Sequence, residues 1–265
     1  MDIFLIAGII AGFAAVLLGM VLKGANIALL FSGEALLIIF GGTIAATANS
    51  FPKKEFLNIP KIFGVLFKER TDIDPIAIIN KIVEMSQATR KNGILALEGD
   101  IQQMENKFMK KGFEMVVDGM DPEYIREVLD TEIESMEERH RVGASVFTTA
   151  GSSAPTLGVL GAVVGLIGAL GDLKDTDKLG ESIAGAFVAT LFGIFVGYVF
   201  CHPAASRLKR KSAEEIKTMY IIVEGVLAIQ EGKNSKAIQM KLAGMLDPKQ
   251  REALEAAVGN AEGSK

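Results

Sequence analysis

Tryptophan is absent from this chain of 265 residues, cysteine occurs once and histidine twice. The lone cysteine, Cys201, cannot form an intrachain disulfide, so folding does not depend on oxidation. Its neighbour His202 faces another way on a helix, which favours helix packing over a metal site. The formal net charge of -4 gives no indication of a nucleic-acid partner. The chain also lacks an HExxH motif, a phosphate-binding glycine loop and a nucleophile–base set, so we expect no enzyme, no metal and no cofactor.

Charge is absent from four long stretches, which are residues 3–22, 35–52, 142–171 and 182–206. A helix of about 20 residues crosses the hydrocarbon layer of a bilayer. The sequence therefore predicts an all-α polytopic membrane protein with four transmembrane helices and a helical cytoplasmic domain. The expected parts are a transmembrane hairpin (1–50), a cytoplasmic helical domain (51–143), a second hairpin (144–206) and cytoplasmic C-terminal helices with a tail (207–265). Residues 3–22 lack a preceding basic region and read as a retained span rather than a secretory signal.

Basic residues near the predicted spans indicate the orientation. Lys and Arg follow the second span, precede the third and follow the fourth, with four between positions 207 and 211. Cytoplasmic loops carry such an excess. We therefore predict an inner-membrane protein with both termini and the central block in the cytoplasm, and with short outer loops at residues 23–34 and 172–181.

The cytoplasmic block shows helical rather than strand periodicity. Asp74 before a proline predicts a helix start, and Gly93 predicts its end. A second helix is predicted over residues 97–108, with Gly112 as its end. A third begins after Asp121 and, with no firm breaker, continues into the third span. The fourth span likewise continues to about residue 230, and a short helix is expected from Asp247 to about residue 258.

Small residues predict how the spans pack. Glycines at 158, 161, 165 and 168 fall on or near one face of the third span, and Gly193 and Gly197 form a small-xxx-small pair in the fourth. Gly8 and Gly12 form another in the first. Helices in lipid are held by close backbone approach at such positions. Pro155 removes one backbone donor and conflicts with the carbonyl of Gly151, which predicts a kink.

One absence and one hydroxyl bear on transport. The spans hold no internal Asp, Glu, Lys or Arg, although proton or sodium carriers need an ionisable group at depth. A partner must therefore bring the carboxylate, since Glu34, Asp172 and Glu181 lie at span edges. Thr190 is the only hydroxyl between Ala184 and Gly197. Its hydroxyl either bonds back to the carbonyl of Ala186 or faces a pore.

The whole layout resembles the A-subunit of the bacterial flagellar motor stator, the MotA/PomA family. The resemblance is strongest in residues 153–170 (SAPTLGVLGAVVGLIGAL) and 185–203 (GAFVATLFGIFVGYVFCHP), with Gly41-Gly42-Thr43 in the second span. It implies a ring of five A-subunits around a dimer of B-subunits. Each B-subunit has one span with an aspartate and a peptidoglycan-binding domain. Ion flow past that aspartate drives the ring, whose cytoplasmic helices push a rotor switch protein.

The resemblance also implies roles for particular residues. Pro155 and Pro203 match the two prolines that shape the inner helices, and Thr190 matches the threonine facing the ion path. Arg90 and Glu98 match the charged pair that meets the rotor, with Lys91 as a neighbouring candidate. Without the resemblance, all three read as solvated positions on a helix turn.

Ion choice rests on the lining of the expected path, assigned to Thr156, Ala162, Ala189 and Thr190. Sodium-type relatives tend to carry a hydroxyl seven residues after the third-span proline, where this chain has Ala162. The position before Thr190 is also apolar. We therefore predict transport of H⁺ rather than Na⁺. The nearest alternative is an ExbB/TolQ-type proton channel subunit, which usually has three spans. A membrane enzyme and a passive scaffold are the remaining readings.

Overall fold

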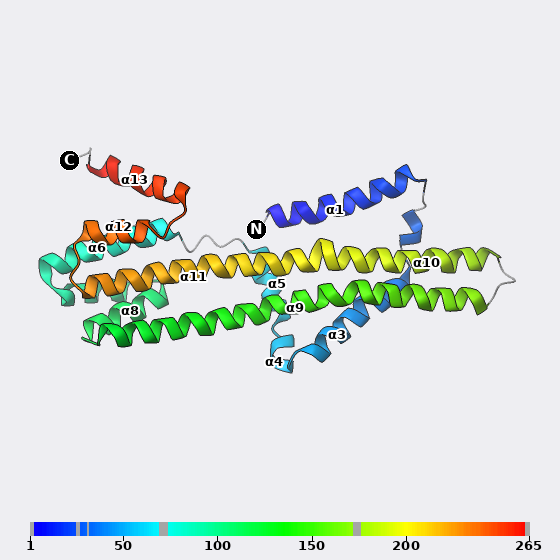
Figure 1. Ribbon diagram of the computed structural model, residues 1–265, viewed down its shortest axis with the longest axis horizontal. Coiled ribbons are helices and arrows are strands. Elements are labelled where there is room, and N and C mark those ends of the chain that lie inside the picture. Colours follow the sequence, from blue (N-terminus) through cyan, green and yellow to red (C-terminus); the bar gives the residue numbers. More distant parts are fainter. Residues whose placement is uncertain (1–2, 25–26, 31, 69–73, 172–175, 263–265) are drawn as a thin grey trace. The chain divides into compact units, whose positions relative to one another are not determined.

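The computed structural model describes residues 3–24, 27–30, 32–68, 74–171 and 176–262. Every regular element in these ranges is helical (Figure 1), which confirms the all-α fold. Its contacts divide the chain into two compact units. Unit 1 comprises residues 1–69 and 139–210, and unit 2 comprises residues 70–138 and 211–265.

Unit 1 contains the apolar helices. Its N-terminal half consists of α1 (Ile3–Leu22), η1 (Ile27–Leu30), α2 (Gly33–Leu36), η2 (Leu37–Gly41), α3 (Gly42–Ser50), α4 (Lys53–Phe56) and α5 (Ile59–Phe67). Its second half contains the C-terminal part of α9 (Pro122–Gly171), then α10 (Thr176–Ile194), η4 (Phe195–Cys201) and the start of α11 (His202–Gln230). The segments η2 and η4 are π-helical turns that continue their flanking α-helices without a break.

Three helical stretches of the described residues are long and apolar enough to cross a membrane: Ile3–Leu22, Pro122–Gly171 and Lys178–Gln230. The two longest stretches continue from their apolar segments into charged segments, as predicted, because no residue at the junction breaks the helix. The helix of the predicted fourth span, α10, begins at Thr176, whereas the sequence predicted that this span begins at residue 182. The predicted span 35–52 is formed by α2, η2 and α3 in succession, so a count of four spans stays a prediction.

The helices α4 and α5 were not predicted. In α5, Leu66 is fully buried, and the ring of Phe63 lies 5.0 Å from that of Phe147 and 6.1 Å from that of Phe200. Aromatic pairs at this spacing add to the stability gained by burial. The short, lysine-flanked run gave too few turns for a helical period to be recognised.

Unit 2 is a small helical bundle with a conventional core. It contains α6 (Pro75–Asn92), η3 (Ile94–Leu97), α7 (Glu98–Gln102), α8 (Lys107–Val117), the first part of α9, most of α11, α12 (Ser235–Ala243) and α13 (Pro248–Glu262). Large apolar side chains with relative exposures below 2% fill its centre, among them Ile79, Ile82, Met85, Leu97, Phe113, Ile125, Leu129, Ile133, Ile221 and Ile222. Burying side chains of this size stabilises a fold by about 1.5–3 kcal/mol each.

The predicted boundaries of α6 are confirmed. The carboxylate of Asp74 accepts a hydrogen bond from the amide of Ile76 at 2.9 Å, as an N-cap does. Gly93 ends the helix with φ of 82°, a left-handed conformation that glycine adopts without strain.

The prediction for residues 97–112 was wrong. The expected single helix is divided into η3, α7 and α8, and the break falls before Asn106, whose side chain caps α8 by accepting from the amide of Met109 at 3.0 Å. Gly112 lies inside α8 and does not end it. A Cβ there would lie 3.1 Å from Val226, so this glycine serves close packing between α8 and α11.

The helix α12 was not predicted. A partly buried network of ion pairs holds it to the bundle. Glu224 on α11 accepts from Arg126 of α9 at 2.7 Å and pairs with Lys241 of α12 at 2.5 Å. Burial tends to raise the pKa of the Glu224 carboxyl, but the hydrogen bonds from Lys241 and Arg126 outweigh it and the pKa is lowered. The carboxylate is therefore stabilised as an anion between two helices.

Candidate functional site

In unit 1, α9 and α10 approach each other closely through glycine. A Cβ on Gly193 would lie 2.6 Å from the carbonyl oxygen of Ala154 and 3.0 Å from the Cα of Gly158. A Cβ on Gly158 would lie 2.8 Å from the carbonyl oxygen of Ala189. The obstacles are backbone atoms, which cannot rotate away. The two backbones therefore touch, as expected of helices packed in lipid.

The contact continues along both helices as an antiparallel seam. Gly161 faces Ala189 and Gly165 faces Ala186, with prospective Cβ distances of 3.0 and 3.2 Å. We call the small residues from Gly151 to Gly165 on α9 and from Ser182 to Gly197 on α10 and η4 the glycine seam. The sequence predicted five of its glycines as packing positions, namely Gly158, Gly161, Gly165, Gly193 and Gly197. Gly168 is different, because nothing lies within 4 Å of where its Cβ would be.

Pro155, where the sequence predicted a kink, lies opposite a distortion in the neighbouring helix. Pro155 is inside α9, and its ring atoms lie 2.9 Å from the prospective Cβ of Gly197. Gly197 belongs to the π-helical turn η4, and its prospective Cβ lies 2.6 Å from the carbonyl oxygen of Gly151. A proline at 155 cannot donate to that carbonyl. The proline and the π turn therefore form one packed irregularity, and sequence patterns do not reveal π turns.

Thr190 lies next to this seam, half-buried. Its hydroxyl donates to the carbonyl oxygen of Ala186 at 3.3 Å, which is the first of the two alternatives. Ala189 is 1% exposed and packs against Gly161. The role of either residue in an ion path stays a prediction.

The remaining residues that were assigned to the ion path or to helix shape are more exposed than Ala189. Ala162 is half-buried, and Pro203 is exposed at the start of α11. Thr156 is exposed, and its hydroxyl donates to the carbonyl oxygen of Ser152 at 3.4 Å. Their functional roles also stay predictions.

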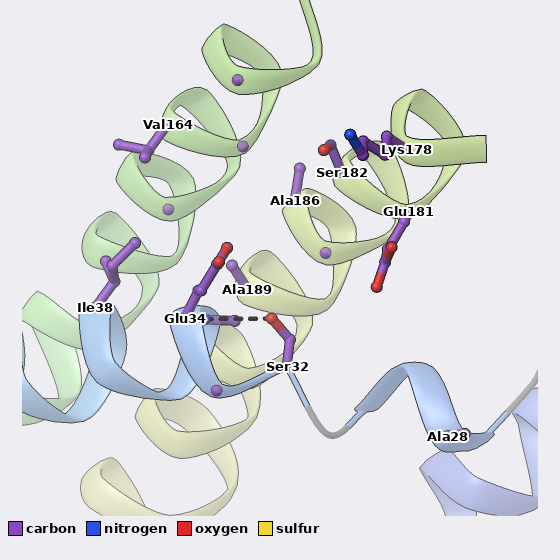
Figure 2. Close-up of a pocket in the computed structure, with 16 residues that line it drawn as sticks. Ala28, Ser32, Glu34, Ile38, Val164, Lys178, Glu181, Ser182, Ala186 and Ala189 are labelled. Atoms are coloured by element: carbon purple, nitrogen blue, oxygen red, sulfur yellow. Dashed lines mark hydrogen bonds between the residues drawn. The ribbon is translucent and has the colours of Figure 1, made fainter. Parts of the chain in front are cut away.

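A cleft of about 650 Å³ in unit 1 was not predicted. Figure 2 shows it between α2, α9 and α10, with Glu34, Lys178 and Glu181 around its wall. Ser32 fixes the start of α2 by accepting from the amide of Ala35 at 3.4 Å (Figure 2). The cleft reaches Gly161 and Ala189 of the glycine seam. It therefore joins the charged helix ends to the residue before Thr190.

The predicted rotor-contact residues lie in unit 2. Arg90 and Lys91 are in the last turn of α6 and Glu98 is in the first turn of α7, so each complements a helix dipole. All three are exposed, and none has an ion-pair partner among the residues that the structure describes. Other charges of unit 2 are paired, such as Lys81 with Asp100 and Lys111 with Glu132. Unpaired charges of this kind are available for an external contact.

Comparison with known proteins gives a consistent result. Residues 100–221 match the MotA/TolQ/ExbB proton channel family. The chain is 48% identical to motility protein A of Bacillus subtilis over 95% of its length and 93% of the relative. It is 37% identical to the chemotaxis protein PomA of Vibrio alginolyticus over 96% of its length and 99% of the relative. Its fold matches a chain of the flagellar MotAB stator complex from Bacillus subtilis with a TM-score of 0.88 at 48% identity, over 94% of this chain and 98% of the other.

Proposed function

This chain belongs to the motility protein A family, and on that premise we propose that it is the membrane A-subunit of a flagellar motor stator. With a B-subunit it forms an ion channel and converts ion flow into torque on a rotor. The observation that carries this proposal is the match over almost the whole chain to a subunit of a MotAB stator complex at 48% identity. The ExbB/TolQ-type alternative shares the family match, but the relatives matched over the full length are motility proteins.

The proposed assembly is a ring of five copies around two B-subunits in the inner membrane, with both termini cytoplasmic. The spans carry no carboxylate of their own, so each B-subunit supplies the aspartate that binds the ion. The glycine seam supports this arrangement. Because α9 and α10 are held by backbone contact, they form a thin, uncharged wall against which a partner helix can lie.

The ion enters from the outer side through the cleft lined by Glu34 and Glu181, and reaches the wall at Ala189 and Thr190. Neutralising the partner's aspartate changes its fit against that wall, and the ring advances. The membrane potential supplies about 2.3 kcal/mol per charge per 100 mV. This is several times the thermal energy, so it biases a step between discrete ring positions. Pro155 and Gly197 shape the wall on the cytoplasmic side of the step.

The transported ion is H⁺. Sodium needs several oxygen ligands to replace its hydration shell, whereas Ala162 and Ala189 present only methyl groups. A carboxylate on the partner can carry a proton without further ligands. Arg90, Lys91 and Glu98 make the rotor contact, which is exposed and therefore weak, at about 0–1 kcal/mol per pair.

Complementation tests the function and the ion together. The chain is expressed with its B-subunit in a flagellated but non-motile host lacking both stator genes, and the rotation of tethered cells is recorded. We expect rotation that persists in sodium-free medium and stops when a protonophore is added. Rotation that requires sodium and survives the protonophore would refute proton coupling but not the stator function. A failure to rotate with any B-subunit, despite membrane insertion, would refute the stator function.

A further inference from the structure

A row of side chains runs along one edge of the contact between α9 and α10, from Thr190 to the start of α11. Four buried residues, spaced four positions apart, face α9: Ala189, Gly193, Gly197 and Cys201. The residue after each of them is half-buried or exposed, and these residues form the row: Thr190, Ile194, Tyr198 and His202. Residues four apart are neighbours on a helix surface. The row therefore begins at the threonine of the predicted ion path and ends at an imidazole.

The π-helical turn η4 keeps this row in line. On a regular α-helix each step of four residues rotates a row by about 40°, so three steps would carry His202 about 120° away from Thr190. The i→i+5 bonds of η4 place one extra residue in the turn, which cancels most of this rotation. The Cα of Thr190 lies 3.2 Å from the prospective Cβ of Gly158. The Nε2 atom of His202 lies 3.1 Å from the prospective Cβ of Gly151, so both ends of the row border α9.

His202 has the chemistry to pass on a proton. Histidine is the side chain whose charge ordinarily changes between about pH 5 and 8, and the four uncharged stretches contain no other histidine. The side chain of His202 is half-buried, and within the described ranges no hydrogen bond occupies either ring nitrogen. Water can therefore reach the ring, and the neutral imidazole can accept a proton on one nitrogen.

Few other titratable groups surround this imidazole in the described part of unit 1. The helices packed against its segment are α9, α1 and α5, through glycines and aromatic rings. The apolar part of α9 and all of α1 carry no titratable side chain, and α5 carries only Lys61. On its own stretch the imidazole has Tyr198, with ring centroids 5.2 Å apart, and Cys201, and the next cation is Arg207. No carboxylate on these segments competes for the proton.

Hydroxyl groups of α9 border the same edge. The two helices run antiparallel, so the residue after a contact position lies on the same side of both. Ser152 follows Gly151 in this way and is exposed. The hydroxyl of Ser152 donates to the carbonyl oxygen of Thr148 at 3.0 Å, and that of Thr156 to the carbonyl oxygen of Ser152 at 3.4 Å. Their oxygens can still accept hydrogen bonds from water, so the edge offers polar sites for a chain of water molecules.

We propose that His202 receives the transported proton on its way to the cytoplasm. The proposal rests on the stator function and names the residue that releases the ion. A proton leaves the partner's aspartate for water near Thr190, and water delivers a proton to the neutral imidazole of His202. The imidazolium then gives a proton to cytoplasmic water and becomes neutral again, so no charge accumulates. About 18 Å of helix separates the two residues, which is why the transfer between them runs through water.

The test uses this chain with its B-subunit in a flagellated, non-motile host that lacks both stator genes. The speed of a bead attached to a flagellum is recorded at low and at high load. We expect His202→Ala and His202→Gln to lower the low-load speed at least about threefold, because a positioned proton acceptor speeds proton transfer. Torque near stall should stay unchanged, because slow steps leave time for transfer through water alone.

Chemical rescue identifies the role of the ring nitrogen. Added imidazole should restore at least half of the lost low-load speed to His202→Ala. Pyrazole, a ring of the same size that accepts no proton near neutral pH, should restore none. His140→Ala is the matched control, since it removes the other histidine, which lies about 16 Å along α9 from Gly151. We expect the control to match the unaltered chain in speed and in its response to imidazole.

Four results would overturn the proposal: an unchanged low-load speed in both His202 variants, an equal loss at all loads, a low-load loss that imidazole does not reduce, or equal rescue by pyrazole. An equal loss at all loads would indicate a packing role beside Gly151 instead. The stator function fails separately, if the unaltered chain does not rotate the motor.

Discussion

The two units pack helices by opposite means. In unit 1, α9 and α10 approach through glycine and alanine until backbone atoms touch, as at Gly158 and Gly193. In unit 2, large side chains such as Phe113 and Ile221 fill the space between helices. The difference follows from the solvent. Water drives large apolar side chains into a core, whereas lipid does not, so membrane helices depend on van der Waals contact between close backbones.

Unit 2 also has a glycine at a close helix contact, and it supports the comparison between the two units. Gly225 of α11 has a neighbour closer than 3 Å from its prospective Cβ, but the neighbour is the side chain of Ile82. The glycine there makes room for a large side chain, whereas Gly193 makes room for another backbone. The same residue type therefore performs two different tasks in the two units.

The largest effect is expected for Gly193→Ala. The new methyl group would lie 2.6 Å from the carbonyl oxygen of Ala154, and two helix backbones would have to separate. We expect loss of co-purification with the B-subunit and loss of rotation. Gly168→Ala on α9 is the control, because it adds the same methyl group to a glycine of the neighbouring helix at a position where nothing lies within 4 Å. Equal behaviour of the two variants would show that the glycine seam is not needed.

An intermediate effect is expected for Phe113→Ala in unit 2. Phe113 is fully buried, and truncating a buried phenylalanine costs about 3–5 kcal/mol. We expect a lower melting temperature of the complex and faster proteolysis within residues 75–138. Co-purification with the B-subunit should persist, because the glycine seam is untouched. The prediction fails if the B-subunit is lost while the cytoplasmic part stays resistant to protease.

The smallest effect is expected for Glu224→Gln, and it depends on pH. The pKa of Glu224 is lowered in the folded state, so its contribution is present above the ordinary carboxyl range, about 4.3, and is lost as pH falls through the lowered value. We expect the variant to be less stable by about 1 kcal/mol at pH 7. Thermal melts at descending pH should show this gap closing in acid. A gap that widens in acid would contradict the assignment.

Some elements could be predicted because their signals are local. The cap at Asp74, the stop at Gly93 and the uninterrupted path from residue 122 into the third span each depend on a few adjacent residues. Gly112 was misread because a glycine that ends a helix and one that admits Val226 look alike in sequence. The division before Asn106 was missed because the apolar period continues across it.

The sequence alone determined the all-α class, the uncharged spans, the missing acid at depth and the family, because these are properties of composition, periodicity and motif. Only the tertiary structure decided that Gly193 meets a backbone and Gly225 a side chain, that Pro155 lies opposite a π turn, and that this turn brings His202 onto the same edge of the helix as Thr190. These facts depend on which helix faces which, and a helical period specifies a face without specifying its neighbour.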